Sequence, residues 1–480
     1  MRVPIVPAIA LSRLLARVTV TAILVVATVL ATPAAWAQGG SRAAIATIRD
    51  AETEAMIRAF LDPLLGAAGV DRRLVQLTLV QDRAINAFVT QGNRLVIHTG
   101  LIQQADSAGE LAGVLAHEVG HVAGGHVARL PEEMRAAMLR TIAAMLIGAG
   151  AGVAARSSDV AMGMMLGGQS SAMGELYAFS RNQEQAADQA GMVFLDRLGW
   201  SGRGLERLLR RLLDQELLAA ARQDPYFRTH PLSRDRLEFV RDQIGRSRFS
   251  DVSVPAALET RFAMVRAKLI AFIDAPMVAW RRYQNDNSAA GRYARAIAQF
   301  RSGRTDAAIE ILDTIIREQP GNPYLLELKG QILFEGGRPL DAIAPLSAAV
   351  RLAPGEPLIR IAHARALIER GDQAALRQAV TELRNAVQED RDSGFAWAQL
   401  AVAYGRLGDL PNAELAMAEQ AMAEGDTAEA RFRAARAERG LPPGPARLRA
   451  TDLRNVVRRD NLTRDQRRAE EEILRRDRNR

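Results

Sequence analysis

Hydrophobic and polar positions alternate along three short stretches near residue 90. Residues 75–80, 86–90 and 94–98 follow the period-two pattern of strands, with a Gly-containing turn between the last two. The pattern then changes, because apolar residues recur at helical spacing from 106 to 122 and again from 172 to 198. The sequence therefore predicts a small sheet followed by long helices.

The second half of the chain contains a regular repeat. Gly303, Gly337 and Gly371 are evenly spaced, and Pro320 and Pro354 are separated by the same interval. This interval is that of a tetratricopeptide repeat, roughly 34 residues, in which two helices pack closely. A further glycine, at 408, follows at a longer interval, which indicates a three-residue insertion in the third unit. We expect an α-solenoid of about four helical pairs that binds peptide segments or partner proteins.

An uncharged segment rich in Ala, Gly and Met separates the two long helices predicted at 106–122 and 172–198. It runs over 141–155, is interrupted by Arg156 and Asp159, and resumes over 160–173. Neither half reaches the roughly 20 residues that a membrane-spanning helix needs. The segment 141–173 can be a mobile lid over the cleft, a membrane-touching hairpin or two core helices, and its glycines favour the lid.

The N-terminus has the features of an export signal. Arg2, Arg13 and Arg17 precede an apolar run without acids over 18–31, and Ala35-Trp36-Ala37 has the spacing that a signal peptidase reads. We expect residues 1–37 to be a signal peptide, with an uncleaved anchor as the alternative. The mature protein is then expected in the periplasm.

The basic charge lies at the two ends of the chain. The formal net charge is +8 and falls to +5 without residues 1–37, which hold three arginines and no acid. Residues 446–480 hold twelve arginines and seven acids, so the rest of the chain is balanced. A nucleic-acid-binding domain carries its excess on a folded face, so no nucleic acid is expected as partner. The tail is expected to be solvated and partly disordered, with membrane-surface contact as the alternative.

Histidine is scarce and cysteine is absent, which excludes thiol chemistry. The six histidines are His98, His117, His121, His126, His230 and His363. Two of them lie four residues apart, at 117 and 121, on a predicted helix that begins with a capping box at 106–110. Imidazoles at this spacing project from one face and can hold one zinc ion, while Glu118 stands beside it as a general base.

A catalytic zinc needs a third protein ligand, and two residues qualify. His126 follows His121 by five residues, which is off the ligand face of a continuous helix unless Gly124 and Gly125 break it. Glu184 lies on the second predicted helix with Asp188 one turn further along. A pair of this kind suits one ligand and one carboxylate that orients a histidine.

Several separate blocks then agree with one family. Asn86-Ala87-Phe88, the 117–121 motif, the run from Ser180 to Asp188, and Thr229-His230-Pro231 with Arg236 occur in the order found in the M48 zinc metallopeptidases, which this chain resembles. The layout of signal peptide, peptidase and repeats is similar to the periplasmic, BepA-like branch of that family, which works on outer-membrane protein assembly.

The resemblance implies a set of roles. His117, His121 and Glu184 are expected to hold one zinc ion, with Glu118 as the base and Asp188 as an assisting residue or proton donor. His230 is expected near the cleft, either as a fourth ligand or as a substrate contact. Misfolded or stalled exported proteins are the implied substrates, and outer-membrane assembly proteins are the implied partners of the repeats.

Together these features predict a mainly α protein, an α+β zincin catalytic domain with a small sheet followed by an α-solenoid. The expected boundaries are a signal peptide at 1–37, a peptidase domain at 38–255, a helical connector at 256–290, repeats at 291–440 and a basic tail at 441–480. The expected function is that of a zinc endopeptidase of the cell envelope. The alternative is a periplasmic chaperone or assembly scaffold with residual or latent proteolysis.

Overall fold

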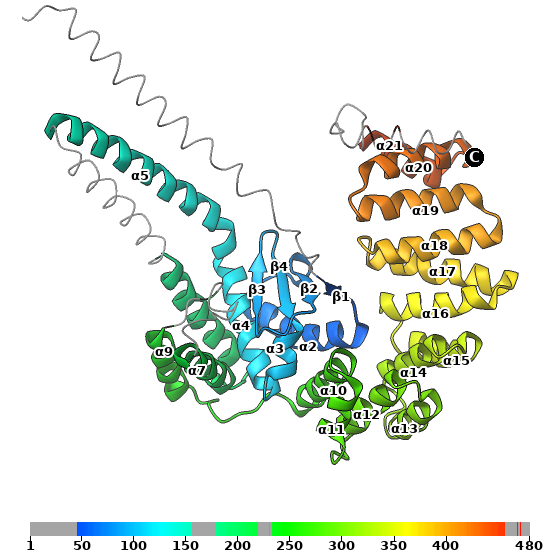
Figure 1. Ribbon diagram of the computed structural model, residues 1–480, viewed down its shortest axis with the longest axis horizontal. Coiled ribbons are helices and arrows are strands. Elements are labelled where there is room, and N and C mark those ends of the chain that lie inside the picture. Colours follow the sequence, from blue (N-terminus) through cyan, green and yellow to red (C-terminus); the bar gives the residue numbers. More distant parts are fainter. Residues whose placement is uncertain are drawn as a thin grey trace, which may run out of the picture. The chain divides into compact units, whose positions relative to one another are not determined.

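The computed structural model describes residues 46–155, 179–218, 230 and 233–456, together with 468 and 471. The predicted signal peptide and most of the basic tail lie outside these residues, as does the 156–173 part of the apolar segment. Within the described residues, no helix has the length and apolar character needed to cross a membrane. Figure 1 shows the arrangement of the helices and strands.

A four-stranded sheet supports the candidate site. Its order is β1 (Thr47–Ile48), β2 (Gln76–Val80), β4 (Arg94–His98) and β3 (Ala87–Thr90), so β3 forms one edge. Strands β2 and β4 are parallel, and the two outer pairs are antiparallel. The three predicted strands are confirmed to within one residue at each end.

Helices cover the sheet and enclose the core of the N-terminal part of the chain (Figure 1). They are α2 (Ala51–Ala68), η2 (Arg72–Leu74), α3 (Thr99–Gln104), α4 (Ala108–Gly124), a helix over 179–197, α7 (Arg203–Leu218) and α9 (Arg234–Arg246). Their apolar faces meet the sheet in one cluster that includes Phe60, Leu79, Ile97 and Leu115, all almost completely buried. Each such side chain contributes about 1.5–3 kcal/mol by leaving water.

Helix α4 begins and ends where its sequence dictates. The predicted capping box is present: the Ser107 hydroxyl accepts from the Glu110 backbone N–H at 3.4 Å, and the Glu110 carboxylate accepts from the Asp106 N–H at 3.2 Å. The helix stops at Gly125, whose φ of 62° is left-handed and suits glycine. A separate helix, α5 (His126–Ala155), then begins in a new direction.

Residues 141–155 of the apolar segment form the second half of α5. The helix is drawn as one continuous ribbon in Figure 1, across the three glycines at 148, 150 and 152. The role of segment 141–173 as a lid stays a prediction, since its remainder lies outside the described residues.

Paired helices make up the second half of the chain and confirm the solenoid. They follow α10 (Ala256–Ile273) and α11 (Pro276–Tyr283), and are α12 (Ala289–Arg301), α13 (Thr305–Glu318), α14 (Pro323–Glu335), α15 (Pro339–Leu352), α16 (Pro357–Arg370), α17 (Gln373–Glu389), α18 (Gly394–Leu407), α19 (Leu410–Ala423), α20 (Thr427–Gly440) and α21 (Pro445–Val456).

The periodic glycines occupy the turns inside these pairs. Gly303, Gly337, Gly371 and Gly408 have φ values of 78°, 82°, 77° and 80°, a region that glycine enters without steric cost. Helix α17 has 17 residues, whereas α13 and α15 have 14 each. The three-residue insertion that the glycine spacing predicts therefore lengthens α17.

A buried charged cluster joins α2 to the first helices of the solenoid. Lys268 of α10 lies 2.6 Å from Asp50, the N-cap of α2, and 3.3 Å from Glu52. The Tyr293 hydroxyl of α12 donates to Glu52 at 2.7 Å, and Glu327 of α14 lies 3.9 Å from the Lys268 ammonium. Burial alone disfavours such charges, so each depends on its partners.

Candidate metal centre

Two helices supply the central side chains, and small residues let these helices approach closely. Helix α4 carries His117 and His121 one turn apart, and the 179–197 helix carries Glu184. A Cβ atom on Gly120 would lie 2.6 Å from the Ala187 carbonyl oxygen, so only glycine fits there. The close contact brings the Glu184 carboxylate against the two imidazoles.

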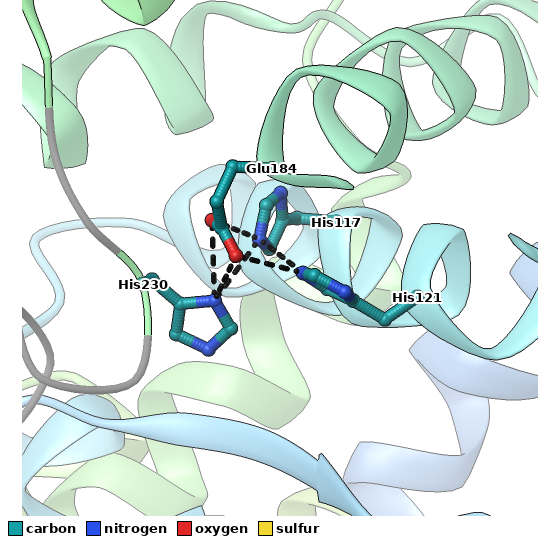
Figure 2. Close-up of side chains that lie close together, drawn as sticks. All are labelled: His117, His121, Glu184 and His230. Atoms are coloured by element: carbon teal, nitrogen blue, oxygen red, sulfur yellow. Dashed lines mark hydrogen bonds and ion pairs between the residues drawn. The ribbon is translucent and has the colours of Figure 1, made fainter. Parts of the chain in front are cut away.

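Four side chains converge on one point, as Figure 2 shows. The Nε2 atoms of His117 and His121 are 3.1 Å apart, and each lies 3.3 Å from an oxygen of Glu184. His230 Nδ1 lies 3.4 Å from His117 Nε2 and 3.2 Å from the Glu184 carboxylate. All four side chains are buried, and their donor atoms lie within 4.8 Å of one another.

His230 reaches this point from a different part of the chain. Its Nε2 lies 3.0 Å from the carbonyl oxygen of Ala87 on the edge strand β3. Because a carbonyl only accepts, Nε2 carries the proton and Nδ1 presents its lone pair to the other donors. A carboxylate oxygen of Glu118 lies near the same Nε2 atom, at 3.3 Å.

The outward nitrogens of the two α4 histidines are also held. Asp188 accepts from His117 Nδ1 at 2.8 Å, which leaves the Nε2 lone pair free to face the cluster. His121 Nδ1 lies 3.0 Å from His126 Nδ1. The break at Gly125 does turn His126 back toward α4, but its ring meets the side of His121 that faces away from Glu184. His126, the alternative third ligand, is therefore not among the four converging side chains.

Arg236 of α9 ties the two carboxylates together. Its Nη1 lies 2.7 Å from Glu184, while Nε and Nη2 donate to the two oxygens of Asp188 at 2.7 and 2.9 Å. A planar guanidinium suits this double contact. The sequence marked Arg236 as part of a family block but gave it no role, because only the fold brings residue 236 next to 184 and 188.

Burial and these hydrogen bonds and ion pairs shift the pKa values of the site residues. Burial by itself would lower the pKa of His117, but the hydrogen bond and charge of Asp188, with Glu184, raise it to about 10. Burial lowers the pKa of His121 to about 3. Burial opposes ionisation of Asp188 too, yet Arg236 and His117 hold the pKa of that carboxyl below its usual range.

Glu118 stands apart from the other carboxylates of the site. It is buried, and apart from the 3.3 Å approach of one oxygen to His230 Nε2, neither oxygen forms a hydrogen bond with a described residue. Burial raises the pKa of Glu118, which makes it a stronger base than an exposed glutamate. A buried carboxylate left in this state is suited to exchange protons with a molecule bound beside it.

The donor set fits a tetrahedral metal ion. Ligands about 2.0–2.1 Å from zinc in a tetrahedron are separated by roughly 3.3 Å. The separations from His117 Nε2 to His121, Glu184 and His230 are 3.1, 3.3 and 3.4 Å. Two imidazoles with one carboxylate are also a ligand set that catalytic zinc takes. The residues present therefore fit the ion that the sequence predicts.

The remaining two histidines lie elsewhere. His98 ends β4, with its Nδ1 3.8 Å from Asp82, and His363 is buried in the solenoid. Neither belongs to the cluster of four converging side chains.

Comparison with known proteins bears on the same residues. A family model described as peptidase family M48 matches residues 51–244, which contain the whole cluster, and a tetratricopeptide repeat model matches 293–357. The chain is 25% identical to the beta-barrel assembly-enhancing protease of Escherichia coli (strain K12) over 352 residues, 71% of this chain and 69% of that protein. It is 30% identical to the metalloprotease LoiP of the same strain over 204 residues, 42% of this chain and 74% of that protein.

Proposed function

This chain belongs to peptidase family M48, and from that premise we propose that it is an exported zinc endopeptidase acting on misfolded or stalled proteins of the cell envelope. Family membership makes it a metalloendopeptidase. The choice of zinc, the substrates and the compartment belong to the proposal. The observation that carries the proposal is the meeting of Glu184 with His117 and His121 around one point.

Each residue then has a distinct task. His117, His121 and Glu184 hold the ion, and Asp188 fixes the orientation of the His117 ring. When bound, zinc supplies a Lewis acid that polarises the scissile carbonyl. Glu118 takes a proton from the attacking water and delivers it to the leaving amine, a task that its raised pKa favours.

The edge strand β3 offers a way to bind peptides of many sequences. Among the described strands it pairs with β4 alone, and Ala87 on this strand lies beside the site through its contact with His230. An extended substrate that pairs with β3 through backbone hydrogen bonds would pass the cluster without a strict sequence requirement. Tolerance of this kind suits an enzyme that removes damaged proteins.

The proposed compartment and partners are supported by the sequence and by similarity. Residues 1–37 have the features of a signal peptide, so we place the mature protein in the periplasm, with association to the outer membrane. The name of the similar Escherichia coli protein refers to β-barrel assembly. We extend that role to this chain, whose repeats are proposed to bind outer-membrane assembly proteins.

His230 has a proposed role as fourth ligand, with contact to substrate as the alternative. Its Nδ1 faces the cluster at the same separations as the other donors. A catalytic zinc keeps one position open, whereas a closed set of four protein ligands is typical of a structural site. His230 in that position would have to leave before the site can act.

The second candidate function is a chaperone or assembly scaffold in which the solenoid acts and proteolysis is residual. The repeat helices, which extend over most of the second half of the chain, favour it. One substitution separates the two. Glu118→Gln keeps the size of the side chain and leaves the ligands in place, but removes the base. We expect the mature protein to contain one zinc per chain and to degrade casein, and the variant to keep zinc and lose at least about 100-fold in rate.

A scaffold would instead keep its cellular function in the Glu118→Gln variant. Purified protein that takes up no metal would contradict the enzymatic proposal directly.

A further inference from the structure

A groove lies in the second half of the solenoid, far along the sequence from the metal centre. It has a volume of about 850 Å³ and is formed by α17, α18, α19 and α21. Its apolar lining includes Trp397, Leu400 and Tyr404 from α18, with Leu415 and Met422 from α19. Protein sites that bind small molecules or side chains have volumes of this order.

The rim of this groove is basic. Arg384 of α17 and Arg391, which follows that helix, are both exposed, and neither forms an ion pair with a described residue. A third arginine, Arg449 of α21, is neutralised by Glu419, which accepts from its Nε and Nη2 at 2.6 and 2.8 Å. Two arginines and one acid, Asp392, therefore remain among the lining residues without an oppositely charged partner among the described residues. The groove has a net positive charge.

A hydrogen bond fixes part of the aromatic lining of the groove. The indole N–H of Trp397 donates to the Arg391 carbonyl at 2.9 Å, so the ring and the backbone of the arginine are fixed together. Arg384 lies close enough to Tyr404 to oppose the rise in its pKa that burial causes. The charge of Arg384 and the backbone of Arg391 are thus each coupled to an aromatic residue of the lining. Tryptophan, tyrosine and arginine are the residues that carry most binding energy in protein interfaces.

We infer that this groove binds a peptide segment in which a large apolar side chain is flanked by carboxylates. The apolar side chain contacts Trp397, Leu400 and Tyr404, and the carboxylates pair with Arg384 and Arg391. Arginine clusters recognise acidic motifs in this way. The inference rests on the proposed protein-binding function of the repeats and adds the place of binding and the chemistry of the partner.

The helix that carries Arg384 is the one lengthened by three residues. Helix α17 extends to Glu389, and Arg391 lies just beyond its end. In a repeat of regular length the helix would end about one turn earlier, so the insertion supplies part of the basic rim. The irregularity in the sequence period and the unpartnered arginines thus occur at the same place.

The test measures peptide binding by the full mature chain carrying Glu118→Gln, so that the probe is not cleaved. The probe is a fluorescein-labelled hexapeptide, Glu-Glu-Leu-Phe-Glu-Glu, followed by anisotropy. Two control peptides replace the glutamates by lysine, or the Leu-Phe pair by Ser-Ser. We expect the acidic apolar peptide to bind at least about tenfold more tightly than either control.

Matched variants locate the binding. Arg384→Glu and Arg391→Glu are expected to weaken it at least about tenfold each, since they turn attraction into repulsion. The control is Arg377→Glu, which makes the same charge change at an exposed position of α17 outside the groove. All three substitutions are on exposed side chains, and circular dichroism checks that each variant folds.

Equal binding of the lysine peptide, or equal loss in the Arg377 control, would overturn the inference, as would binding that none of the three variants changes. The readout does not involve hydrolysis. Failure here would therefore leave the protease proposal intact, and failure of the zinc and casein measurements would leave the groove untouched.

Discussion

Gly120 of α4 faces Ala187 so closely that a Cβ there would lie 2.6 Å from the Ala187 carbonyl oxygen and 2.9 Å from its Cα. Gly191 forms a second close approach, against the backbone of Ala116 and His117. The distance between the two helices is therefore set by the absence of side-chain atoms. That distance in turn decides whether Glu184 reaches the histidines.

We expect Gly120→Ala to push the two helices apart. The backbone of residue 187 cannot move away as a flexible side chain would, so the cost should be about 1–3 kcal/mol of unfolding free energy. Metal affinity should fall with it, measured by titration against a chromophoric chelator. Gly66→Ala is the control, because a Cβ there meets nothing within 4 Å and alanine should stabilise α2 by about 0.5–1 kcal/mol. Unchanged stability and metal affinity in Gly120→Ala would contradict the packing argument.

Asp188→Asn is expected to lower metal affinity by about 10–100-fold. An amide in place of the carboxylate keeps the size but removes the charge that fixes the proton on His117 Nδ1 and pairs with Arg236. Competition with a chelator at constant pH measures the change. If Asp188 served only as a proton donor in the reaction, the variant would bind metal normally and lose rate alone.

His230→Ala tests the fourth-ligand proposal. Removal of the ring takes away one nitrogen that lies 3.4 Å from His117 Nε2 and opens one corner of the site. Metal affinity should fall, and casein degradation should rise because the corner becomes available to substrate and water. A lower rate with unchanged metal affinity would indicate a substrate contact instead. Unchanged metal affinity together with unchanged casein degradation would contradict both the fourth-ligand role and the substrate contact.

Glu327 should make stability depend on pH near neutrality. Burial raises the pKa of this carboxyl to about 7, against the opposing effect of Lys268. The folded state then holds a proton that the unfolded state releases near pH 4.5. The contribution of this proton to the free energy of unfolding is complete below pH 4.5. It is lost as pH rises through about 7.

The measurement is the melting temperature at pH 6 and pH 8, with metal in excess, for the mature protein and for Glu327→Gln. The native protein should lose stability over this interval, and the variant, which has no proton to lose at this position, should show a smaller change. Equal slopes would show that Glu327 does not titrate there.

Local patterns predicted the elements and most of the site. The strands, the capping box at Ser107 and the repeats each depend on neighbours in sequence, and all three are present. The spacing of His117 and His121 on one helix was enough to predict that they converge. Glu184 was predicted from its place in a block that matches the family. Arg236 and His126 obtain their partners only from the way the helices fold back. No periodicity could assign those contacts.

The buried cluster at Lys268 was missed for the same reason. Its partners come from positions 50, 52, 293 and 327, and nothing local relates them. A lone lysine on an apolar helix gives no sign of carboxylates that lie in distant parts of the sequence.

The donor side chains of the metal cluster are at positions 117, 121, 184 and 230, and the arginine that binds both Glu184 and Asp188 follows at 236. A ribosome makes the histidine pair well before it makes the acid that completes it. A nascent chain thus lacks the complete cluster until Glu184 has been made and has packed against α4, and the arginine that holds Glu184 and Asp188 follows later still. The order of these residues along the chain therefore delays the assembly of the cluster during biosynthesis.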